Sequence, residues 1–237
     1  MVLLSVALSL APTPLLSDLY QQYTTQNAVA FVALGYISGV FLTGAVWATA
    51  MGIQREQWMG TLETVYAAPI PRTVIVAGNT LHSIQHQGLG AFLALLLASL
   101  TLRIPLDPRG IPAALLFLSI GLIASFGLGL FFSATVLFLR RGWIVVEPLA
   151  FVLVLCSPTA YPITVLPLPL QVVARINPLT YAIEGFRWSL IASMPLSYLT
   201  TYALPGLTLA LIFLAAGLLA FYRIERRVRA SGALSRF

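Results

Sequence analysis

The chain has 237 residues, of which 59% are hydrophobic and 8% are charged, and its mean hydropathy is +0.93. A soluble domain of this length cannot bury that much apolar surface, so the composition predicts an integral membrane protein. The charged residues are thirteen arginines and seven acids, and the absence of lysine excludes an ordinary Walker ATP site and a Schiff-base lysine. The formal charge of +6 would suit nucleic acid, but arginines spread thinly between apolar runs favour a role in membrane topology. The single cysteine, Cys156, excludes an internal disulfide.

The apolar runs predict one all-α transmembrane domain over residues 1–237, because a helix needs about 20 apolar residues to cross a bilayer. The expected spans are approximately 1–11 (partial), 28–53, 74–102, 111–139, 143–160 and 199–222. The first segment is too short to cross unaided and lacks the basic region of a signal peptide. We interpret it as part of a first span whose beginning is missing; the alternative is a short interfacial helix.

The arginines predict the orientation through the positive-inside rule. Four arginines would lie outside: Arg103, Arg109, Arg175 and Arg187. Nine would lie in the cytoplasm: Arg55, Arg72, Arg140, Arg141, Arg223, Arg226, Arg227, Arg229 and Arg236. With six spans, both termini are then cytoplasmic, in a cell inner (plasma) membrane.

Between the second and third spans, residues 54–68 contain no proline and predict a cytoplasmic helix. Trp58, Leu62 and Val65 recur at helical spacing and share one apolar face. Pro69 and Pro71 would end the helix and return the chain to the membrane. The alternative is an interfacial loop that only connects two spans.

The third span begins with polar residues: Asn79, His82, Gln85, His86 and Gln87. His82 and His86 have the spacing of a metal site, but Ser83 stands where a zinc protease has glutamate and no third ligand is apparent. We therefore expect no metal. Polar residues in spans usually face protein or water, so they predict lining of the inner pathway or contact with a partner helix.

Two further features of the spans leave alternatives open. Gly35 and Gly39 form a GxxxG pattern that permits close helix packing, and it is weak evidence for a dimer seam. Glu147 follows Arg140 and Arg141 closely, which favours an interfacial ion pair over lining of an inner cavity.

The segment 157–169 carries four prolines and predicts a turn near the outer leaflet. It would lead to an outer helix over approximately 177–193, with Asn177 as N-cap and Pro178 at the first helical position. Glu184 and Arg187 would form a pair three residues apart. The alternative role for this region is a structural cap on the last span.

Two motifs resemble those of the ABC-2 type ABC transporter permease family. The first is Arg55-Glu56-x-x-x-Gly60-Thr61-Leu62-Glu63 followed by Ala68-Pro69-Ile70-Pro71-Arg72, and the second is Asn177-Pro178-Leu179-Thr180-Tyr181 followed by Glu184 and Arg187. They occur in the family's order in a six-span layout, and the resemblance extends from Ala28 onward. The family usually begins with a cytoplasmic amphipathic helix, which this sequence does not show.

The resemblance implies a six-span, type V exporter-like fold that acts as the permease of an ATP-driven exporter. The 54–68 helix would be the coupling helix that contacts a separate ABC ATPase subunit, where ATP and Mg²⁺ bind; this chain would bind no cofactor. The implied coupling residues are Arg55, Glu56, Gly60, Thr61, Leu62, Glu63, Pro69 and Arg72. The implied outer exit residues are Asn177, Pro178, Tyr181, Glu184 and Arg187. The expected partners are that ATPase, a second permease chain and membrane lipid, without nucleic acid.

Two rival functions need no ATPase. An intramembrane enzyme would need clustered catalytic groups, and only His82, His86 and Glu147 are available. A secondary transporter would show inverted repeats and midplane charges, which the sequence does not. The substrate is not readable, although the small number of charges mildly favours an amphipathic or lipid-linked molecule.

Overall fold

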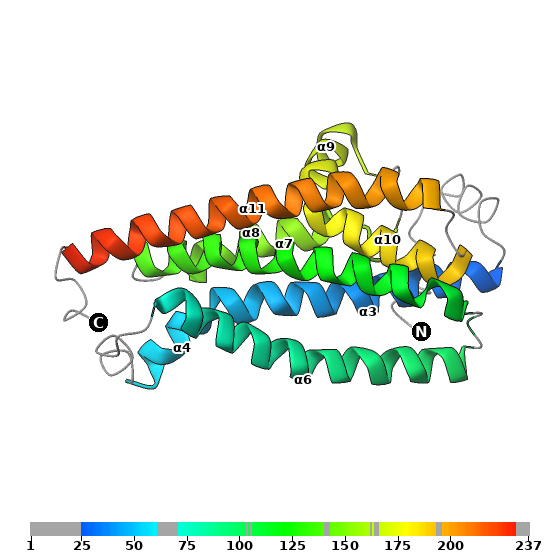
Figure 1. Ribbon diagram of the computed structural model, residues 1–237, viewed down its shortest axis with the longest axis horizontal. Helices are drawn as coiled ribbons and strands as arrows, with labels where there is room; N and C mark the ends of the chain where they lie inside the picture. The colour runs from blue at the N-terminus through cyan, green and yellow to red at the C-terminus, as the bar shows by residue number, and fades with distance from the viewer. Residues whose placement is uncertain are drawn as a thin grey trace.

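A computed structural model describes residues 25–60, 71–102, 104, 106–139, 143–161, 163, 166–192 and 196–230. The regular elements in these ranges are helical, as the sequence predicts. They are α3 (Thr25–Ala50), α4 (Gly52–Trp58), α6 (Arg72–Thr101), the 3-10 helix η1 (Pro108–Gly110), α7 (Ile111–Phe138), α8 (Trp143–Leu155), α9 (Leu168–Ile176), α10 (Pro178–Ala192) and α11 (Leu196–Ala230). The long helices run along a common axis and form an elongated bundle (Figure 1).

Within the described ranges, four helical segments are long and apolar enough to cross a membrane. They are Val29–Ala50, Thr73–Leu102, Pro108–Phe138 and Tyr202–Arg227. They match four of the predicted spans, whereas residues 1–11 lie outside the described residues. The predicted span 143–160 is shorter than expected, because α8 has 13 residues and ends at Leu155. At about 1.5 Å per residue it covers about 20 Å of a hydrocarbon core of about 30 Å.

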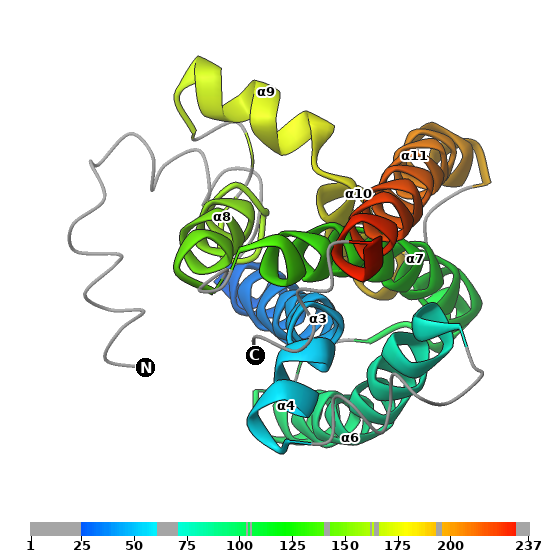
Figure 2. The same ribbon diagram turned by 90° about the vertical axis from the view of Figure 1, so that its left-hand side faces the viewer.

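Helix α7 is the centre of the bundle. It packs against α11, α10 and α3, and the end-on view places it between α3 and α11 (Figure 2). Leu34, Phe117 and Ile183 are fully buried where α3, α7 and α10 meet. Helix α6 packs against α3 and α4, at the side of the bundle away from α11.

Small residues allow the helices to approach closely. A Cβ at Gly217 of α11 would lie 2.2 Å from the carbonyl oxygen of Gly127 in α7. Ser125 of α7 donates a hydrogen bond of 3.0 Å to the carbonyl of Leu42 in α3. Since lipid tails are as apolar as leucine, such close packing and interhelical hydrogen bonds are what hold membrane helices together.

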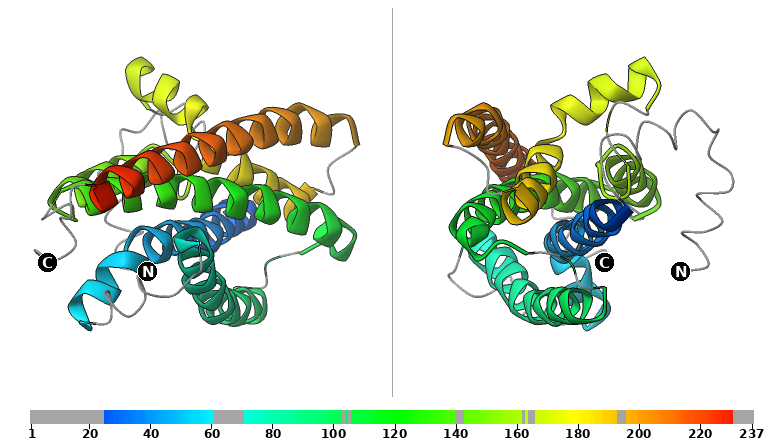
Figure 3. Two further views of the ribbon diagram at one scale, coloured as in Figure 1. Left: turned by 60° about the vertical axis from the view of Figure 1, so that its left-hand side comes forward. Right: turned by 90° about the vertical axis from the view of Figure 1, so that its right-hand side faces the viewer.

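The outer segment contains a helix that the sequence did not predict. Helix α9 begins after Pro167, with Pro169 in its first turn, where proline is tolerated because the missing N–H has no intrahelical partner. It projects from the bundle and exposes Leu168 and Val172 (Figure 3). Helix α10 follows at Pro178 and matches the expected outer helix to within a residue.

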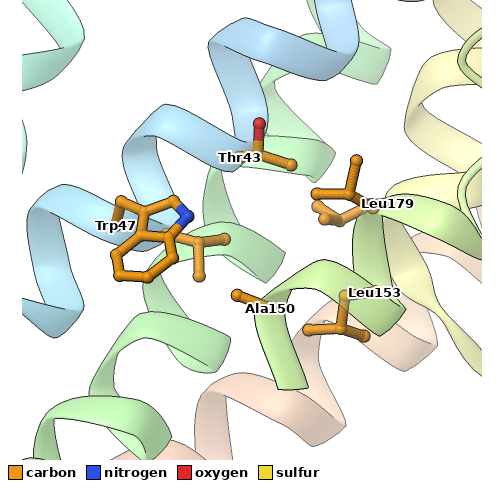
Figure 4. Close-up of a pocket in the computed structure, with 7 residues that line it drawn as sticks. Thr43, Trp47, Ala150, Leu153 and Leu179 are labelled. Atoms are coloured by element: carbon orange, nitrogen blue, oxygen red, sulfur yellow. The ribbon is translucent and has the colours of Figure 1, made fainter. Parts of the chain in front are cut away.

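Helices α8 and α10 both lie beside α3. Thr43 and Trp47 of α3 face Ala150 and Leu153 of α8 and Leu179 of α10 (Figure 4). The cavity between them is about 10 Å³, about enough for the centre of one water molecule. Helix α10 therefore packs against α3, with Leu179 at the contact.

Exposed arginines gather at one end of the bundle. Helix α4, the start of α8 and the end of α11 lie at this end, and Arg55, Arg223, Arg226 and Arg227 are exposed there (Figure 1). Arg109 is exposed at η1, at the opposite end. The last helix is longer than its predicted span, because α11 continues through this arginine-rich part to Ala230.

Candidate functional site

The predicted helix 54–68 is described only as far as Gly60, and residues 61–68 lie outside the described residues. Helix α4 ends at Trp58 and continues α3 beyond a bend at Met51: the Met51 N–H donates to the Trp47 carbonyl and the Arg55 N–H donates to the Met51 carbonyl, both at 2.9 Å. Trp58 is 77% exposed, Arg55 is exposed and Glu56 is half-buried. Four of the implied coupling residues lie outside the described residues: Thr61, Leu62, Glu63 and Pro69. Arg72 is the first residue of α6.

Gly60 explains why the helix stops. Its φ is +69°, the left-handed conformation that commonly follows a helix and that glycine adopts at little cost. A Cβ at Gly60 would meet no described atom within 4 Å. Its backbone conformation, rather than a contact, is what favours glycine.

A polar cleft of about 180 Å³ lies between α3, α4 and the first half of α6. Its lining residues are Ala48, Gly52, Arg55, Asn79, His82, Ser83, His86 and Gln87. On α6, the polar residues Asn79, Ser83 and Gln87 stand four apart and therefore share one face. The facing residues on α3 and α4 are small and equally spaced: Gly44, Ala48 and Gly52.

Direct contacts fix this arrangement. Thr49 of α3 and Thr80 of α6 are both buried, and their hydroxyl oxygens are 2.8 Å apart. A Cβ at Gly44 would lie 1.5 Å from Oε1 of Gln87, so the amide occupies space that glycine leaves open. The Gln87 amide nitrogen in turn donates to the Ser83 hydroxyl. A small-residue face on α3 thus admits the polar face of α6.

The structure brings together four of the five polar residues named above for the third span. Asn79, His82, His86 and Gln87 line the cleft, whereas Gln85 is not part of the lining. Among the described residues, no group of three or more histidine, cysteine or acidic side chains is arranged to hold a metal ion. Arg55, which the sequence analysis assigned to ATPase coupling, lines the same cleft.

Asn177 joins two helices of the outer segment. Its Oδ1 accepts a hydrogen bond of 3.1 Å from the Leu179 N–H, which confirms the predicted N-cap, with Pro178 as the first residue of α10. Its Nδ2 donates to the Leu153 carbonyl at 3.2 Å and to the Ser157 hydroxyl at 3.0 Å. The same side chain therefore starts α10 and ties it to the end of α8.

Arg187 holds the turn that follows α8. The residue is fully buried, and its Nη2 donates to the carbonyls of Pro158 and Thr159 at 2.5 and 3.1 Å. The guanidinium also lies 3.4 Å from the centre of the Phe31 ring, within the range of a cation–π interaction. The predicted Glu184–Arg187 pair is not its main described contact, because the guanidinium binds the carbonyls of an irregular segment.

Gly35 and Gly39 make room for this turn. A Cβ at Gly35 would lie 1.9 Å from Nη2 of Arg187 and 2.1 Å from the carbonyl oxygen of Thr159. A Cβ at Gly39 would lie 2.4 Å from the Thr159 side chain. The GxxxG face that suggested a dimer seam is therefore occupied within the chain. The proline-rich run 157–162 was the sequence signal for this contact. Prolines prevent a regular helix there, so the carbonyls of the run need hydrogen-bond donors from elsewhere in the chain.

Tyr181 and Glu184 complete the outer segment. The Tyr181 hydroxyl donates to the Arg175 carbonyl at 3.0 Å, and its ring packs edge-on against Tyr202 of α11, with centroids 6.4 Å apart. Helix α10 is not one of the four spanning segments; there, burial raises the pKa of Glu184 to about 7, and the positive charge of Arg187 opposes the rise.

Glu147 lies near the arginine-rich end. It is exposed on α8 and borders an open cavity of about 460 Å³ together with Trp47, Met51 and Trp58. The expected ion-pair partners, Arg140 and Arg141, lie outside the described residues. Glu147 therefore borders a cavity, and the ion pair with Arg140 and Arg141 stays a prediction.

Comparison with known proteins identifies one family. A family model described as ABC-2 type transporter matches residues 2–191. The matched range contains both motif segments and every described helix up to α10 except its last residue. No curated protein matches the chain.

Proposed function

Because the chain belongs to the ABC-2 type transporter family, we propose that it is the membrane-spanning permease of an ATP-driven exporter whose ATPase is a separate subunit. The family match over residues 2–191 is the observation that carries this proposal. The sequence supports the division of labour, because a chain without lysine cannot supply the lysine of a P-loop. ATP and Mg²⁺ would therefore bind to the partner ATPase.

The arginine-rich end of the bundle is proposed to face the cytoplasm. Exposed Arg55, Arg223, Arg226 and Arg227 gather there, and short cytoplasmic segments are enriched in arginine. The chain would then be a multi-pass protein of the inner membrane with both ends in the cytoplasm. Anionic headgroups would attract the arginines at the end of α11.

Helix α4 and the residues that follow it are proposed to receive the motion of the ATPase. Trp58 is exposed at the end of α4. Tryptophans that become buried when a partner binds are frequent anchors of protein interfaces. Because α4 continues α3 by backbone hydrogen bonds, a push on α4 would pass directly to a spanning helix. Such a rigid-body shift requires contacts that differ between the two states of the transporter.

The outer segment is proposed to shape the exit of the pathway. Asn177 and Arg187 fix the turn after α8 and the start of α10 by hydrogen bonds. Glu184 and Tyr181, which are only half-buried on α10, remain available to a molecule leaving toward the outside.

A second permease chain, identical or homologous, is proposed to complete the pathway. No residue in the most apolar stretch of α6 is buried within this chain. That stretch exposes Phe92, Leu96, Leu97 and Leu100, and membrane lipid and the second chain would share it.

The proposal is tested by purifying the full chain in lipid nanodiscs after co-expression with a candidate ABC ATPase subunit from the same organism. We expect the ATPase to co-purify. Trp58→Ala should weaken its capture at least tenfold, because truncating an interface tryptophan costs about 2 kcal/mol or more. Glu63→Arg should also weaken capture, or separate ATP hydrolysis from export.

Tyr222→Ala provides the matched control. Tyr222 is an aromatic residue of α11 near the same end of the bundle and is 63% exposed, so its removal should leave ATPase capture unchanged. A chain that captures no ATPase, or a Trp58→Ala variant that behaves like Tyr222→Ala, would contradict the proposed coupling role of α4.

A further inference from the structure

We propose that the polar cleft between α3, α4 and α6 binds the anionic phosphate headgroup of a membrane amphiphile. The inference rests on the side chains of the cleft and on its depth in the membrane. It deepens the proposed transport function by naming a ligand class, and it is tested separately from ATPase binding.

The lining of the cleft is built to donate hydrogen bonds to an anion. It combines the guanidinium of Arg55 with the imidazoles of His82 and His86 and the amide of Asn79, and none of its lining residues is acidic. Charge-assisted bonds from arginine to phosphate oxygens are short and strong, and the planar guanidinium matches phosphate geometry. The positive charge of the cleft therefore favours a negatively charged group.

Asn79 carries a donor that the described protein leaves unused. Its Nδ2 is buried and has no hydrogen-bond partner within the described part of the chain. A Cβ at Gly52 would lie 3.5 Å from that nitrogen, so the donor lies directly against the small-residue face. A buried donor without a partner costs about 1–3 kcal/mol, and a phosphate oxygen would satisfy it once the amide turns from the small-residue face into the cleft.

The cleft is large enough for the headgroup. A cavity of about 150 Å³ can hold a benzene-sized molecule, and this one measures about 180 Å³. Its size is maintained by fixed contacts on the same two helices: the Thr49–Thr80 hydrogen bond, and Gln87 seated over Gly44.

The depth of the cleft indicates an amphiphile rather than a free anion. The spanning segment Thr73–Leu102 has 30 residues and is about 45 Å long, whereas the hydrocarbon core is about 30 Å thick. The core takes about 20 residues, approximately 83–102 when Leu102 lies at its outer boundary, so Asn79 and His82 lie near the inner headgroups. A lipid whose phosphate is bound there can keep its acyl chains against the exposed apolar face of α6.

The test measures lipid binding by the full chain in phosphatidylcholine nanodiscs, without ATPase. The probes are phosphatidic acid, diacylglycerol with the same acyl chains, inorganic phosphate and Zn²⁺. We expect phosphatidic acid to bind, and Arg55→Gln and Asn79→Leu each to weaken it about tenfold. Because the Asn79 amide nitrogen makes no described hydrogen bond, Asn79→Leu should fold normally.

Two matched controls isolate the cleft. Gln85→Leu changes an exposed amide on the same helix, and Arg226→Gln removes an exposed arginine from α11; neither should change phosphatidic acid binding. Equal effects of control and cleft variants would overturn the site. If diacylglycerol binds as tightly as phosphatidic acid, the proposed recognition of phosphate is wrong. If inorganic phosphate binds tightly and phosphatidic acid does not, the proposed amphiphilic ligand is wrong.

The remaining outcomes separate this inference from the other hypotheses. Zn²⁺ binding that is lost in His82→Leu while phosphatidic acid fails to bind would overturn the proposal in favour of a metal site. If Asn79→Leu loses phosphatidic acid but still captures the ATPase, the headgroup site is supported. If wild type captures no ATPase yet binds phosphatidic acid at the cleft, the transport proposal fails and the headgroup site stands.

Discussion

Replacing Gly35 with alanine adds one methyl group where α3, the turn at Pro158 and Thr159, and Arg187 meet. The new Cβ would lie 1.9 Å from Nη2 of Arg187 and 2.1 Å from the Thr159 carbonyl oxygen. The arginine side chain can move aside, but the carbonyl belongs to the backbone and cannot move alone. We therefore expect Gly35→Ala to lower the free energy of unfolding.

The magnitude follows from three effects. Overpacking a tightly packed site costs about 1–3 kcal/mol. Displacing the guanidinium gives up a hydrogen bond from a charged donor, worth about 1.5–3 kcal/mol. Alanine in a helix interior is favoured over glycine by about 0.5–1 kcal/mol, which offsets part of the loss. The expected net destabilisation is about 3 kcal/mol, which lowers the melting temperature of a chain of this length by about 6–12 °C.

The chain carries its own reporter for this measurement. Cys156 is the single cysteine, is fully buried and immediately precedes the affected turn, so a thiol-reactive dye reports its exposure on heating. The control is Gly90→Ala on α6, where a Cβ would meet no described atom within 4 Å. Equal melting temperatures for Gly35→Ala and Gly90→Ala would refute the packing argument.

Two further predictions concern hydrogen bonds between helices. Asn177→Ala should cost about 2–3 kcal/mol, because it removes an N-cap and two bonds to the end of α8. Asn177→Asp keeps the acceptor of the N-cap but loses the amide donor, so its melting temperature should lie between those of wild type and Asn177→Ala. A melting temperature as low as that of Asn177→Ala would argue against a contribution of the N-cap. A double-mutant cycle of Thr49→Val and Thr80→Val, measured by reversible unfolding, should give a coupling of about 0.6 kcal/mol, with about 1.7 as the upper limit. Strictly additive effects would show that this bond contributes no net stability.

Several features follow from the sequence alone because they depend on local chemistry. Long apolar runs can satisfy their backbone groups in lipid only as helices, so the positions of α3, α6, α7 and α11 follow from hydropathy. The start of α10 follows from Asn177 and Pro178, since an N-cap acts within a few residues. The family motifs, too, are contiguous short segments that can be read without the fold.

The end of α4 and the presence of α9 were not predictable in the same way. Residues 54–68 lack proline and have helical periodicity, yet the described helix ends at Trp58 because Gly60 takes a positive φ. Helix α9 starts in a proline-rich stretch, which hydropathy and proline content alone suggested would be irregular. In both cases a backbone choice at one or two residues decided the outcome.

The contacts between distant segments were decided only by the tertiary structure. The sequence suggested a Glu184–Arg187 pair and, weakly, a dimer seam at Gly35. The fold brings Arg187 and Gly35 to the turn at Thr159. It likewise places Arg55 and Asn79 in one cleft. The sequence analysis assigned Arg55 to ATPase coupling and Asn79 to the inner pathway. The physical reason is that lipid tails are as apolar as the side chains they touch, so hydropathy locates a membrane helix but does not show which of its faces packs against protein.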